Sequence, residues 1–372
     1  MIRVGITGQN GFVGSHLYMT LGLYPNEFQR VSFEKDFFEN NDLLDDFVSN
    51  CDVIVHLAGM NRHEDPQIIF NTNVNLAKLL VNSLERTACR PQIIMSSSTQ
   101  EESDNLYGKS KKEAREIIEK WAKKANAIFN GLVIPNVFGP FGKPFYNSVV
   151  ATFCHQITKG ESPTIHVDGN LKLIYVGELV SQILHQIRHQ ETNTKILISS
   201  TAEYKVSEIL ELLNIYKATY QDKGEMPLLK SSFEFHLFNT YRGYMDIASY
   251  FPVKFAQHTD DRGSFVEIIR LGIGGQVSFS TTAPGITRGN HFHTRKIERF
   301  AVIKGKALIQ LRKIGTDEIL DFHLDGDQPA YVDMPIWYTH NIKNIGDEIL
   351  YTNFWINEAY NPNDSDTYFE NV

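Results

Sequence analysis

The first 200 residues alternate short β-branched runs with amphipathic stretches, and this alternation restricts the fold more than any other feature of the sequence. Four runs are typical of buried strands: Arg3–Thr7, Val53–Leu57, Gln92–Ser96 and Gly131–Ile134. Four stretches carry the apolar spacing of helices: Phe12–Leu23, Asn73–Thr87, Ser110–Asn126 and Ser148–Lys159. Because neighbouring parallel strands need a crossover between them, this order predicts an α/β, doubly wound sheet of the Rossmann type.

The pattern changes after about residue 252, where short apolar runs follow one another closely between Gly, Asp, Pro and Asn. These runs are Gln276–Ser280, Arg299–Ile303, Ala307–Arg312, Glu318–His323, Ala330–Val332 and Ile349–Trp355. Runs of this kind without helical period are typical of a β-sandwich or barrel. Between the two regions we predict one helix, Ser207–Leu213, with Ser207 as its N-cap. We therefore predict two domains, residues 1–250 and 251–372, as suits a chain of 372 residues.

Charge and cysteine content exclude several classes of protein. The formal net charge of -8 lacks the positive field that draws proteins onto nucleic acid or anionic membranes, so we expect neither partner. Cys51, Cys89 and Cys154 form neither a disulfide framework nor a paired CxxC metal site. No apolar run approaches the roughly 20 residues that span a bilayer, and the first residues lack the features of a signal peptide. We therefore expect a cytoplasmic protein.

A glycine-rich turn follows the first predicted strand. Glycines recur at intervals of three residues in Thr7–Gly14, at Gly8, Gly11 and Gly14. Without a Cβ, the first two let a pyrophosphate approach the backbone, and the third lets the helix pack on the sheet. The positive end of the following helix also favours phosphate, so the turn predicts a dinucleotide site, although such a glycine pattern also occurs in ordinary tight turns.

A tyrosine and a lysine four residues apart form the second candidate site. Tyr107 and Lys111 would share one face of a helix, where the ammonium group lowers the pKa of the phenol and suits it to proton exchange with a carbonyl. Ser96–Ser98 ends a predicted strand just upstream, where a hydroxyl could hydrogen-bond the reacting oxygen. Alone, such a pair is usually a solvated surface pair. Together with the glycine turn it predicts a catalytic site.

Over residues 1 to 245 the sequence resembles the extended short-chain dehydrogenase/reductase family. The segments TGQNGFVG, HLAG, SSS, YGKSK and PNVFGP carry the resemblance, with Val133 and Ile134 where the family often has Arg. The resemblance implies that Tyr107 donates the proton, that Lys111 holds the nicotinamide ribose and tunes Tyr107, and that Ser98 orients the carbonyl. It also implies that Asp52 and Leu57–Gly59 line the adenine side. The implied cofactor residues are Gly8, Gly11, Phe12, Val13, Gly14, Lys35, Asp52, Leu57, Ala58, Gly59, Tyr107, Lys111 and Pro135.

The choice between NAD and NADP is left open by the segment after the second strand. A carboxylate there suits the ribose diol of NAD, and a cation suits the 2′-phosphate of NADP. The segment offers Glu34 and Asp36 on one side and Lys35 on the other. The local sequence is therefore undecided.

The β-rich half carries a set of metal-ligating side chains. His291 and His293 lie two residues apart and point the same way on a strand, Glu298 follows across a turn, and His340 lies on a later strand after Pro335. Three imidazoles and one carboxylate suit Zn²⁺ and also Fe²⁺, Mn²⁺ or Ni²⁺. The bare His-x-His pair is weak evidence, and the complete spacing predicts a metal site.

Residues 253 to 372 resemble the cupin superfamily, which implies an all-β, jelly-roll barrel. Trp337 stands where the second cupin motif usually has Gly. The segments Asp261–Phe265 and Gly285–His291 further resemble the deoxysugar 3,5-epimerase branch, in which the His after Arg-Gly acts as a base. Here His291 is expected to bind metal instead. Lys296, between the ligands, is a speculative base that is more often a surface lysine.

The fusion as a whole resembles the bifunctional enzymes of bacterial capsular-polysaccharide synthesis. That resemblance implies C3 epimerisation of a UDP-2-acetamido-2,6-dideoxy-4-hexulose in the cupin, followed by NADPH reduction at C4 to UDP-2-acetamido-2,6-dideoxy-L-talose, the route of UDP-N-acetyl-L-fucosamine. It also implies NADPH rather than NADH, Zn²⁺ and a homodimer. Two alternatives stay open: a reductase of another nucleotide-deoxysugar route with a structural cupin, and a non-enzymatic, sugar-binding or interaction cupin.

Overall fold

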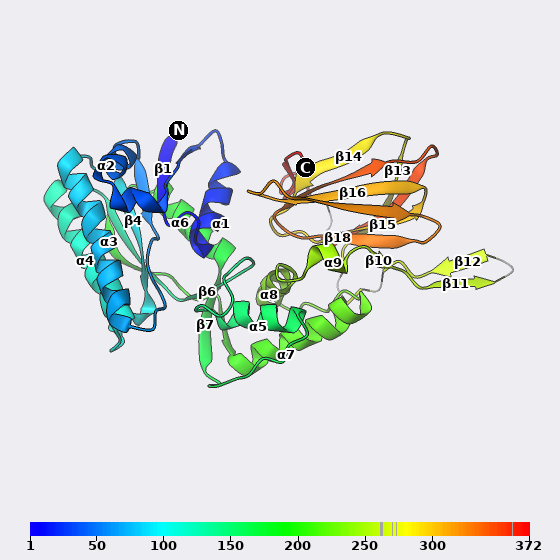
Figure 1. Cartoon of the computed structure of the whole chain (residues 1–372), viewed down its shortest axis with the longest axis horizontal. Coiled ribbons are helices and arrows are strands. Elements are labelled where there is room, and N and C mark those ends of the chain that lie inside the picture. Colours follow the sequence, from blue (N-terminus) through cyan, green and yellow to red (C-terminus); the bar gives the residue numbers. More distant parts are fainter. Residues whose placement is uncertain (261–262, 270, 273, 359) are drawn as a thin grey trace. The chain divides into compact units, whose positions relative to one another are not determined.

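The computed structural model describes residues 1–372 except 261–262, 270, 273 and 359. The chain divides into two compact units, and each is described by itself (Figure 1). The first comprises residues 1–152 and 167–206, and the second comprises residues 153–166 and 207–372. The two units are therefore interleaved along the sequence. The domain ranges 1–250 and 251–372 stay a prediction, and by packing residues 207–250 group with the β-rich part of the chain.

The first unit is built on a six-stranded parallel sheet. Its strand order is β2-β1-β3-β4-β5-β8, and every neighbouring pair is parallel. The strands are β1 (Ile2–Thr7), β2 (Phe28–Val31), β3 (Val53–His56), β4 (Gln92–Ser98), β5 (Phe129–Ile134) and β8 (Asn193–Leu197). The reversal of order beside β1 confirms the doubly wound α/β fold, and it places the turn after β1 at the carboxyl edge of the sheet.

Helices cover both faces of this sheet. The helices are α1 (Phe12–Gly22), α2 (Asn41–Ser49), α3 (Pro66–Thr87), α4 (Leu106–Ala125) and α6 (Val176–Arg188). One buried apolar cluster joins α1 and α6 to the sheet, and another joins α2, α3 and α4 to the opposite face. A small sheet of β6 (Asn136–Phe138), β7 (Asn170–Tyr175) and β9 (Ala202–Lys205) and the short helices η1 (Lys35–Glu39) and η2 (Thr99–Glu102) complete the unit.

Side-chain caps explain where several of these helices begin. The Asn40 amide accepts hydrogen bonds from two backbone N–H groups of α2, and Asn105 accepts from Gly108 at the start of α4. Asp65 caps α3, with Pro66 at its first position, so this helix begins seven residues before the predicted Asn73. The predicted N-cap Ser207 was wrong, because α7 (Val206–Tyr216) already includes it.

The second unit contains two five-stranded antiparallel sheets. Their orders are β10-β18-β15-β20-β13 and β17-β16-β19-β14-β21, which confirms the all-β cupin of jelly-roll type. The strands are β10 (Val253–Lys254), β13 (Gln276–Thr282), β14 (Thr287–Phe292), β15 (Glu298–Lys304), β16 (Lys306–Lys313), β17 (Ile319–Asp325), β18 (Ala330–Met334), β19 (Tyr338–Asn344), β20 (Leu350–Ile356) and β21 (Tyr368–Phe369). A separate hairpin pairs β11 (Gln257–Asp260) with β12 (Gly263–Val266).

Helical segments that precede the barrel pack within the same unit. They are α5 (Val149–Thr158), which begins in the first unit, α7, η3 (Lys217–Gln221), α8 (Ser232–Arg242) and α9 (Ile247–Tyr250). The Tyr220 hydroxyl donates to Asp333 over 2.6 Å, and Asp333 also binds the Arg299 guanidinium at 2.7 Å. All three side chains are buried, so a satisfied polar network fixes these helices to the barrel. Within the described ranges, no helix is both long and apolar enough to cross a membrane.

Candidate active site and metal centre

The glycine-rich turn after β1 is as tight as its sequence predicts. Gly8 has a φ of +79°, in the left-handed region. A Cβ at Gly14 would lie 2.2 Å from the Gly8 carbonyl oxygen, so a side chain at this position would collide with the turn. Gly11 is the N-cap of α1, and its N–H donates to the Gly8 carbonyl. Phe12 and Val13 form the first turn of α1.

A pocket of about 370 Å³ opens beside this turn. It is lined by Gly8, Gln9, Asn10, Gly11, Phe33, Lys35, Phe38, Ala58, Gly59, Met60, Thr72, Leu76 and Tyr146. Five predicted cofactor residues therefore come together here: Gly8, Gly11, Lys35, Ala58 and Gly59. Leu57 directly precedes this group, and its N–H donates to the Thr7 carbonyl. Backbone amides, an aromatic pair and one ammonium group suit a dinucleotide.

The charged residues after the second strand differ in their position relative to the pocket. Glu34, Lys35 and Asp36 are all exposed, and of the three only Lys35 is part of the pocket lining. The cation of this segment thus faces the site and the two carboxylates do not, a distinction that the sequence left open.

Asp52 is not brought to the pocket. It lies just before β3, and its carboxylate binds Arg3 at the start of β1, with Arg3 Nη2 2.8 Å from Asp52 Oδ1. The glycine turn follows the other end of these parallel strands, where Thr7 pairs with His56. Four residues of strand correspond to roughly 13 Å. Asp52 thus lies at the amino edge of the sheet, and its ion pair lowers the pKa of its carboxyl group.

Ser98, Tyr107 and Lys111 meet at the carboxyl edge of the sheet. Ser98 is the last residue of β4, and Tyr107 and Lys111 lie one turn apart in α4. The Ser98 hydroxyl faces the Tyr107 phenol closely enough to lower its pKa. Lys111 Nζ lies 3.4 Å from Ser96 Oγ, and a Cβ on Gly59 would lie 3.7 Å from it. The three side chains therefore adjoin the pocket beside the turn.

Burial governs the pKa values of this cluster. Burial raises the pKa of Tyr107, and the Ser98 hydrogen bond offsets only part of that effect, so the lowered phenol pKa predicted from Lys111 was wrong. Burial lowers the pKa of Lys111 to about 8. It also lowers the pKa of the neighbouring His56 to about 3, with the Lys111 charge adding to the effect, and this ring is neutral. The Tyr107 phenol is therefore protonated at neutral pH.

Two residues of this site were missed by sequence reasoning. Tyr146 lines the pocket, raises the pKa of Tyr107 electrostatically and accepts a hydrogen bond from the Asn61 N–H. Asn73 is buried in α3, where its amide binds the Ser110 hydroxyl and both backbone groups of Met60. Neither residue type has a spacing that would have identified it. Pro135 follows Ile134, the strand partner of Ser98, so it lies at the same edge of the sheet.

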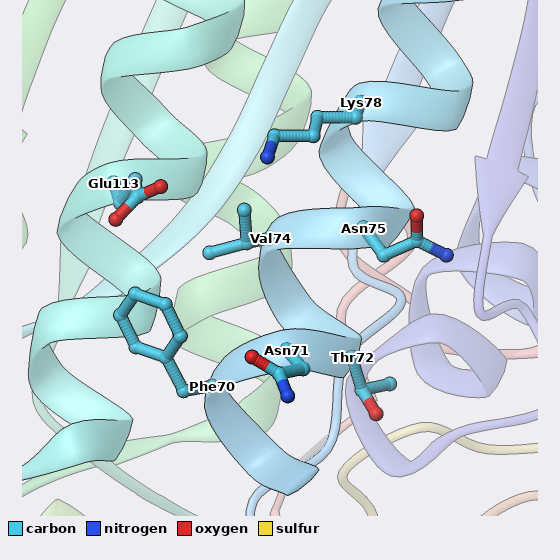
Figure 2. A pocket seen from close by; sticks show the side chains of 7 residues that line it. All are labelled: Phe70, Asn71, Thr72, Val74, Asn75, Lys78 and Glu113. Atoms are coloured by element: carbon cyan, nitrogen blue, oxygen red, sulfur yellow. The ribbon is translucent and has the colours of Figure 1, made fainter. Parts of the chain in front are cut away.

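A second hollow, of about 500 Å³, lies along α3 (Figure 2). Residues of α3 form most of it, and Glu113 of α4 closes one side, with the Lys78 side chain extending from α3 toward α4. None of the predicted site residues lines it. The dinucleotide pocket is therefore the candidate site of this unit.

The four predicted metal ligands converge in the barrel. The ligand atoms of His291, His293, Glu298 and His340 all lie within 4.8 Å of one another. Glu298 Oε2 is 3.1 Å from His293 Nε2, 3.3 Å from His340 Nε2 and 3.9 Å from His291 Nε2. Burial raises the pKa of the Glu298 carboxyl group, but its interactions with the three imidazoles outweigh burial and hold this pKa well below its usual value. A carboxylate faces three imidazoles, as a divalent transition metal requires.

Buried polar atoms without a hydrogen-bond partner support this interpretation. His293 Nε2, His340 Nε2 and Glu298 Oε2 are fully buried and none makes a hydrogen bond. The other ring nitrogens are occupied, since His293 Nδ1 lies 2.5 Å from the Asp366 carbonyl and His340 Nδ1 lies 3.2 Å from the Tyr338 carbonyl. Carbonyl acceptors at Nδ1 fix the tautomer that leaves the Nε2 lone pair free for a metal. The residues present therefore fit a bound metal ion.

The turn between the ligands is held by Asp366, a residue that the sequence did not single out. Its carboxylate accepts hydrogen bonds from the Thr294 hydroxyl and N–H and from the N–H groups of Arg295 and Lys296. The Lys296 ammonium group donates to the Ser365 carbonyl over 2.6 Å, and the residue is 1% exposed. Lys296 is thus a buried part of the turn, and the interpretation as a surface lysine was wrong.

Trp337 adopts the backbone conformation for which glycine is usual. Its φ is +63°, in the left-handed region. The indole is buried and stacks on Phe292 with ring centroids 5.6 Å apart, and the Trp337 N–H donates to the His293 carbonyl. Packing therefore holds the turn before β19 in the shape that glycine would give. Of the segment that resembles deoxysugar epimerases, Asp261 and Arg262 lie outside the described residues.

Comparison with known proteins agrees with both halves of this description. Residues 4–199 match the NAD dependent epimerase/dehydratase family, and residues 258–368 match the polysaccharide biosynthesis C-terminal domain. A relative from Pseudomonas aeruginosa, UDP-2-acetamido-2,6-beta-L-arabino-hexul-4-ose reductase, is 30% identical over 374 residues, covering 99% of this chain and 98% of the relative.

Solved structures extend the similarity to the fold of the whole chain. The capsular polysaccharide assembling protein CapF from Staphylococcus aureus is 34% identical, with a TM-score of 0.65 and full coverage of both chains. CapF with the inhibitor 3-isopropenyl-tropolone is 32% identical, with a TM-score of 0.60 and the same coverage. The predicted resemblance to a reductase and cupin fusion of capsule synthesis is thereby confirmed. Because its family match spans more than half of the sequence and its relative aligns over nearly all of it, this chain belongs to the NAD dependent epimerase/dehydratase family.

Proposed function

We propose that this protein is a bifunctional nucleotide-sugar enzyme of surface-polysaccharide synthesis. The cupin epimerises C3 of a UDP-2-acetamido-2,6-dideoxy-4-hexulose, and the N-terminal unit reduces the C4 ketone with NADPH to UDP-2-acetamido-2,6-dideoxy-L-talose. One observation carries the proposal: the Ser98, Tyr107 and Lys111 cluster adjoins a dinucleotide pocket in a chain that also holds a buried quartet of metal ligands. The substrate follows from the related hexulose reductase.

The reduction assigns a separate role to each member of the cluster. When bound, NADPH would supply the hydride that forms the new C4–H bond. Tyr107 donates its proton to the ketone oxygen, so that the C=O double bond becomes an alcohol, and the Ser98 hydroxyl orients that oxygen by a hydrogen bond. The Lys111 ammonium group holds the nicotinamide ribose and stabilises the phenolate that remains on Tyr107.

NADPH is the proposed reductant because of the charge that lines the pocket. Lys35 faces the pocket beside Phe33 and Phe38, while Glu34 and Asp36 are not part of its lining. A cation at this position suits the additional 2′-phosphate of NADPH and offers no acceptor to the ribose diol of NADH.

The proposed metal in the cupin is zinc, held by His291, His293, Glu298 and His340. When bound, it supplies Lewis-acid polarisation of a substrate oxygen, or rigidity to the strands that carry the ligands. CapF is solved with a tropolone inhibitor, whose adjacent carbonyl and hydroxyl oxygens form a bidentate metal ligand, and this supports a metal centre in the related fold. A C4 ketone acidifies the neighbouring C3–H, so epimerisation before reduction is chemically consistent. The proposal extends to a homodimer in the cytoplasm.

A panel of nucleotide 4-ketosugars tests this proposal. We expect NADPH oxidation with the UDP-linked 2-acetamido-2,6-dideoxy-4-hexulose and, in deuterated water without NADPH, deuterium at C3 by mass spectrometry and NMR. Reduction without deuterium incorporation would support a reductase with a structural cupin. Neither reaction with any member of the panel would overturn the proposal in favour of a binding module.

A further inference from the structure

A buried carboxylate that the proposed reaction does not use lies under the catalytic cluster. Glu101 is 4% exposed, in η2, and it forms a two-pronged ion pair with Arg115, which is 6% exposed. Arg115 Nε lies 2.8 Å from Glu101 Oε1, and Arg115 Nη2 lies 3.2 Å from Glu101 Oε2. Both charged groups are thus buried, and each is compensated by the hydrogen bonds of the ion pair.

This pair joins the segments that carry the catalytic residues. The Ser97 hydroxyl donates to Glu101 Oε1, and Ser97 directly precedes Ser98 at the end of β4. Arg115 lies one helical turn beyond Lys111 in α4. Its Nη1 also donates to the Thr194 carbonyl of β8 over 3.2 Å. The strand that ends at Ser98 and the helix that carries Lys111 are therefore fixed to one carboxylate.

The Arg115 side chain of this ion pair packs against a glycine, Gly131. At Gly131 of β5, a Cβ would lie 2.4 Å from the Thr194 carbonyl oxygen and 2.7 Å from Arg115 Cδ, so glycine leaves room both for the neighbouring strand and for the arginine stem. Buried ion pairs contribute little net stability, since desolvation offsets their attraction, and their retention is better explained by structural specificity. An arrangement with a glycine beside the arginine stem and a satisfied carboxylate therefore points to a role in geometry.

We propose that Glu101 is a positioning residue of the reductase: through Ser97 and Arg115 it fixes Ser98 of β4 relative to Tyr107 and Lys111 of α4, and its charge supports the Lys111 ammonium group. The proposal rests on the proposed reduction. Ser98 and Tyr107 belong to different elements joined by η2, so the distance between their hydroxyls depends on the contacts that η2 makes. Within η2, Gln100 binds Ser98 and the α4 N-cap Asn105 at the surface, and Glu101 makes the buried contacts to Ser97 and Arg115.

The charges that face this pair agree with an electrostatic role. Burial lowers the pKa of Lys111 to about 8, and Glu101 counteracts that shift. His56, the other titratable group that interacts with Lys111, is neutral. Arg115 neutralises part of the Glu101 charge, and Lys195 of β8 lies 3.8 Å from Glu101 Oε2. Arg115 is itself shared with Glu119, 3.3 Å from its Nη1, and Lys195 is shared with Glu102 at 2.9 Å, so neither cation belongs to Glu101 alone.

The neighbouring Glu102 provides a matched control. It binds the same Lys195 over 2.9 Å, but its side chain is 68% exposed and it is not bound to Ser97 or Arg115. We would compare Glu101→Gln with Glu102→Gln in the full chain, measuring NADPH oxidation with the 4-ketosugar across pH 6 to 10 and NADPH binding by fluorescence over the same range.

In the wild type, both signals should fall as pH rises through about 8, because Lys111 loses its charge there. In Glu101→Gln the fall should move about 1 pH unit lower, as expected when a nearby opposite charge is removed. The kcat should drop about 10-fold with little change in the KM of the sugar, which is the signature of a misplaced acid rather than lost binding. Glu102→Gln should match the wild type in every measurement.

An unchanged pH midpoint in a folded Glu101→Gln protein, or equal shifts in both variants, would overturn the inference. If Glu101→Gln fails to fold, Arg115→Lys provides a second test. This variant keeps the positive charge but loses the two parallel hydrogen bonds to Glu101, so it should lower kcat without moving the pH midpoint. The NADPH-binding profile needs no sugar. It therefore reports on Glu101 even if no 4-ketosugar is turned over, which separates a failure of this inference from a failure of the proposed function.

Discussion

At the scale of single residues, the proposed reduction depends most directly on the Tyr107 proton. Burial raises the pKa of this phenol, so the proton is in place throughout the neutral range. We predict that Tyr107→Phe lowers the rate of 4-ketosugar reduction at least about 100-fold, the lower end for removal of a positioned general acid. The melting temperature and NADPH affinity should stay close to those of the wild type. Near-normal NADPH oxidation by the variant would exclude Tyr107 as the acid.

Trp337 allows a test in which strain and packing act in opposite directions. Removing a buried aromatic side chain costs about 3 to 5 kcal/mol, whereas relieving a left-handed backbone returns about 1 to 2 kcal/mol. Trp337→Gly should therefore lower the free energy of unfolding by about 2 kcal/mol. Trp337→Ala should lower it further, because alanine keeps the strain at a φ of +63°. Urea unfolding of the metal-loaded proteins measures both values, and a more stable alanine variant would contradict this account.

Single residues also show why some of the site could be predicted and some could not. Tyr107 and Lys111 are four positions apart, and one helical turn suffices to bring them together. The position of Asp52 depends instead on which end of its strand faces the glycine turn. That end is set by the parallel register of β1 and β3, which pairs Thr7 with His56 and leaves Asp52 beside Arg3.

At the scale of elements, the turn between β14 and β15 depends on a segment far along the chain. The Asp366 carboxylate accepts hydrogen bonds from three consecutive backbone N–H groups of this turn, and its carbonyl orients His293. Removal of a residue that hydrogen-bonds a metal ligand typically weakens metal binding about 10- to 100-fold. We predict that Asp366→Ala releases zinc at least about 10-fold faster to a chromophoric chelator.

Asp364→Ala is the matched control for this prediction. Its side chain is 64% exposed and binds the Arg295 guanidinium, with no bond to the turn backbone. It should release zinc at the wild-type rate, while His293→Ala should bind little metal at all. Equal release rates for Asp364→Ala and Asp366→Ala would contradict a specific role of Asp366.

Most elements of the first unit could be predicted, and two exceptions, β7 and α6, have a physical reason. The strands β1, β3, β4 and β5 are short apolar runs separated by turn residues. By contrast, β7 ends at Tyr175 and α6 begins at Val176, so strand and helix form one apolar stretch without an intervening Gly, Pro or Asn. Periodicity does not separate a strand from a helix within such a stretch. Both elements were therefore missing from the predicted order.

At the scale of the whole molecule, the change in sequence pattern near residue 252 predicted two kinds of secondary structure but not the packing of residues 207–250. The aromatic side chains of this segment are buried by partners far along the chain, as Tyr220 is by Asp333. Local periodicity carries no information about such partners. These helices were predicted to belong to the first domain, and by packing they group with the second unit.

This packing predicts the behaviour of a fragment of residues 1–250. Tyr220, Phe238 and Tyr241 are at most 1% exposed in the full chain, and the fragment lacks the barrel residues that bind and cover this segment. Backbone amides of residues 207–250 should therefore exchange hydrogen rapidly in the fragment and slowly in the full chain, while β1 and β3 to β5 stay protected in both. Mass spectrometry of proteolytic peptides measures this difference. Equal protection of residues 207–250 in both proteins would show that the segment folds without the barrel.

The interleaving of the two units also has a consequence for the order in which the chain is synthesised. Cys154 and Ile157 are buried in the second unit, and Thr158 is bound to the Tyr244 carbonyl and to Gln221. On the ribosome these partners follow roughly 60 to 90 residues later, which at about 5 to 20 residues per second is a delay of about 3 to 18 s. During that time the apolar face of α5 stays uncovered, although the rest of the first unit, residues 167–206, is made in the interval. The nascent chain thus presents an apolar binding surface to chaperones at this one stage of translation.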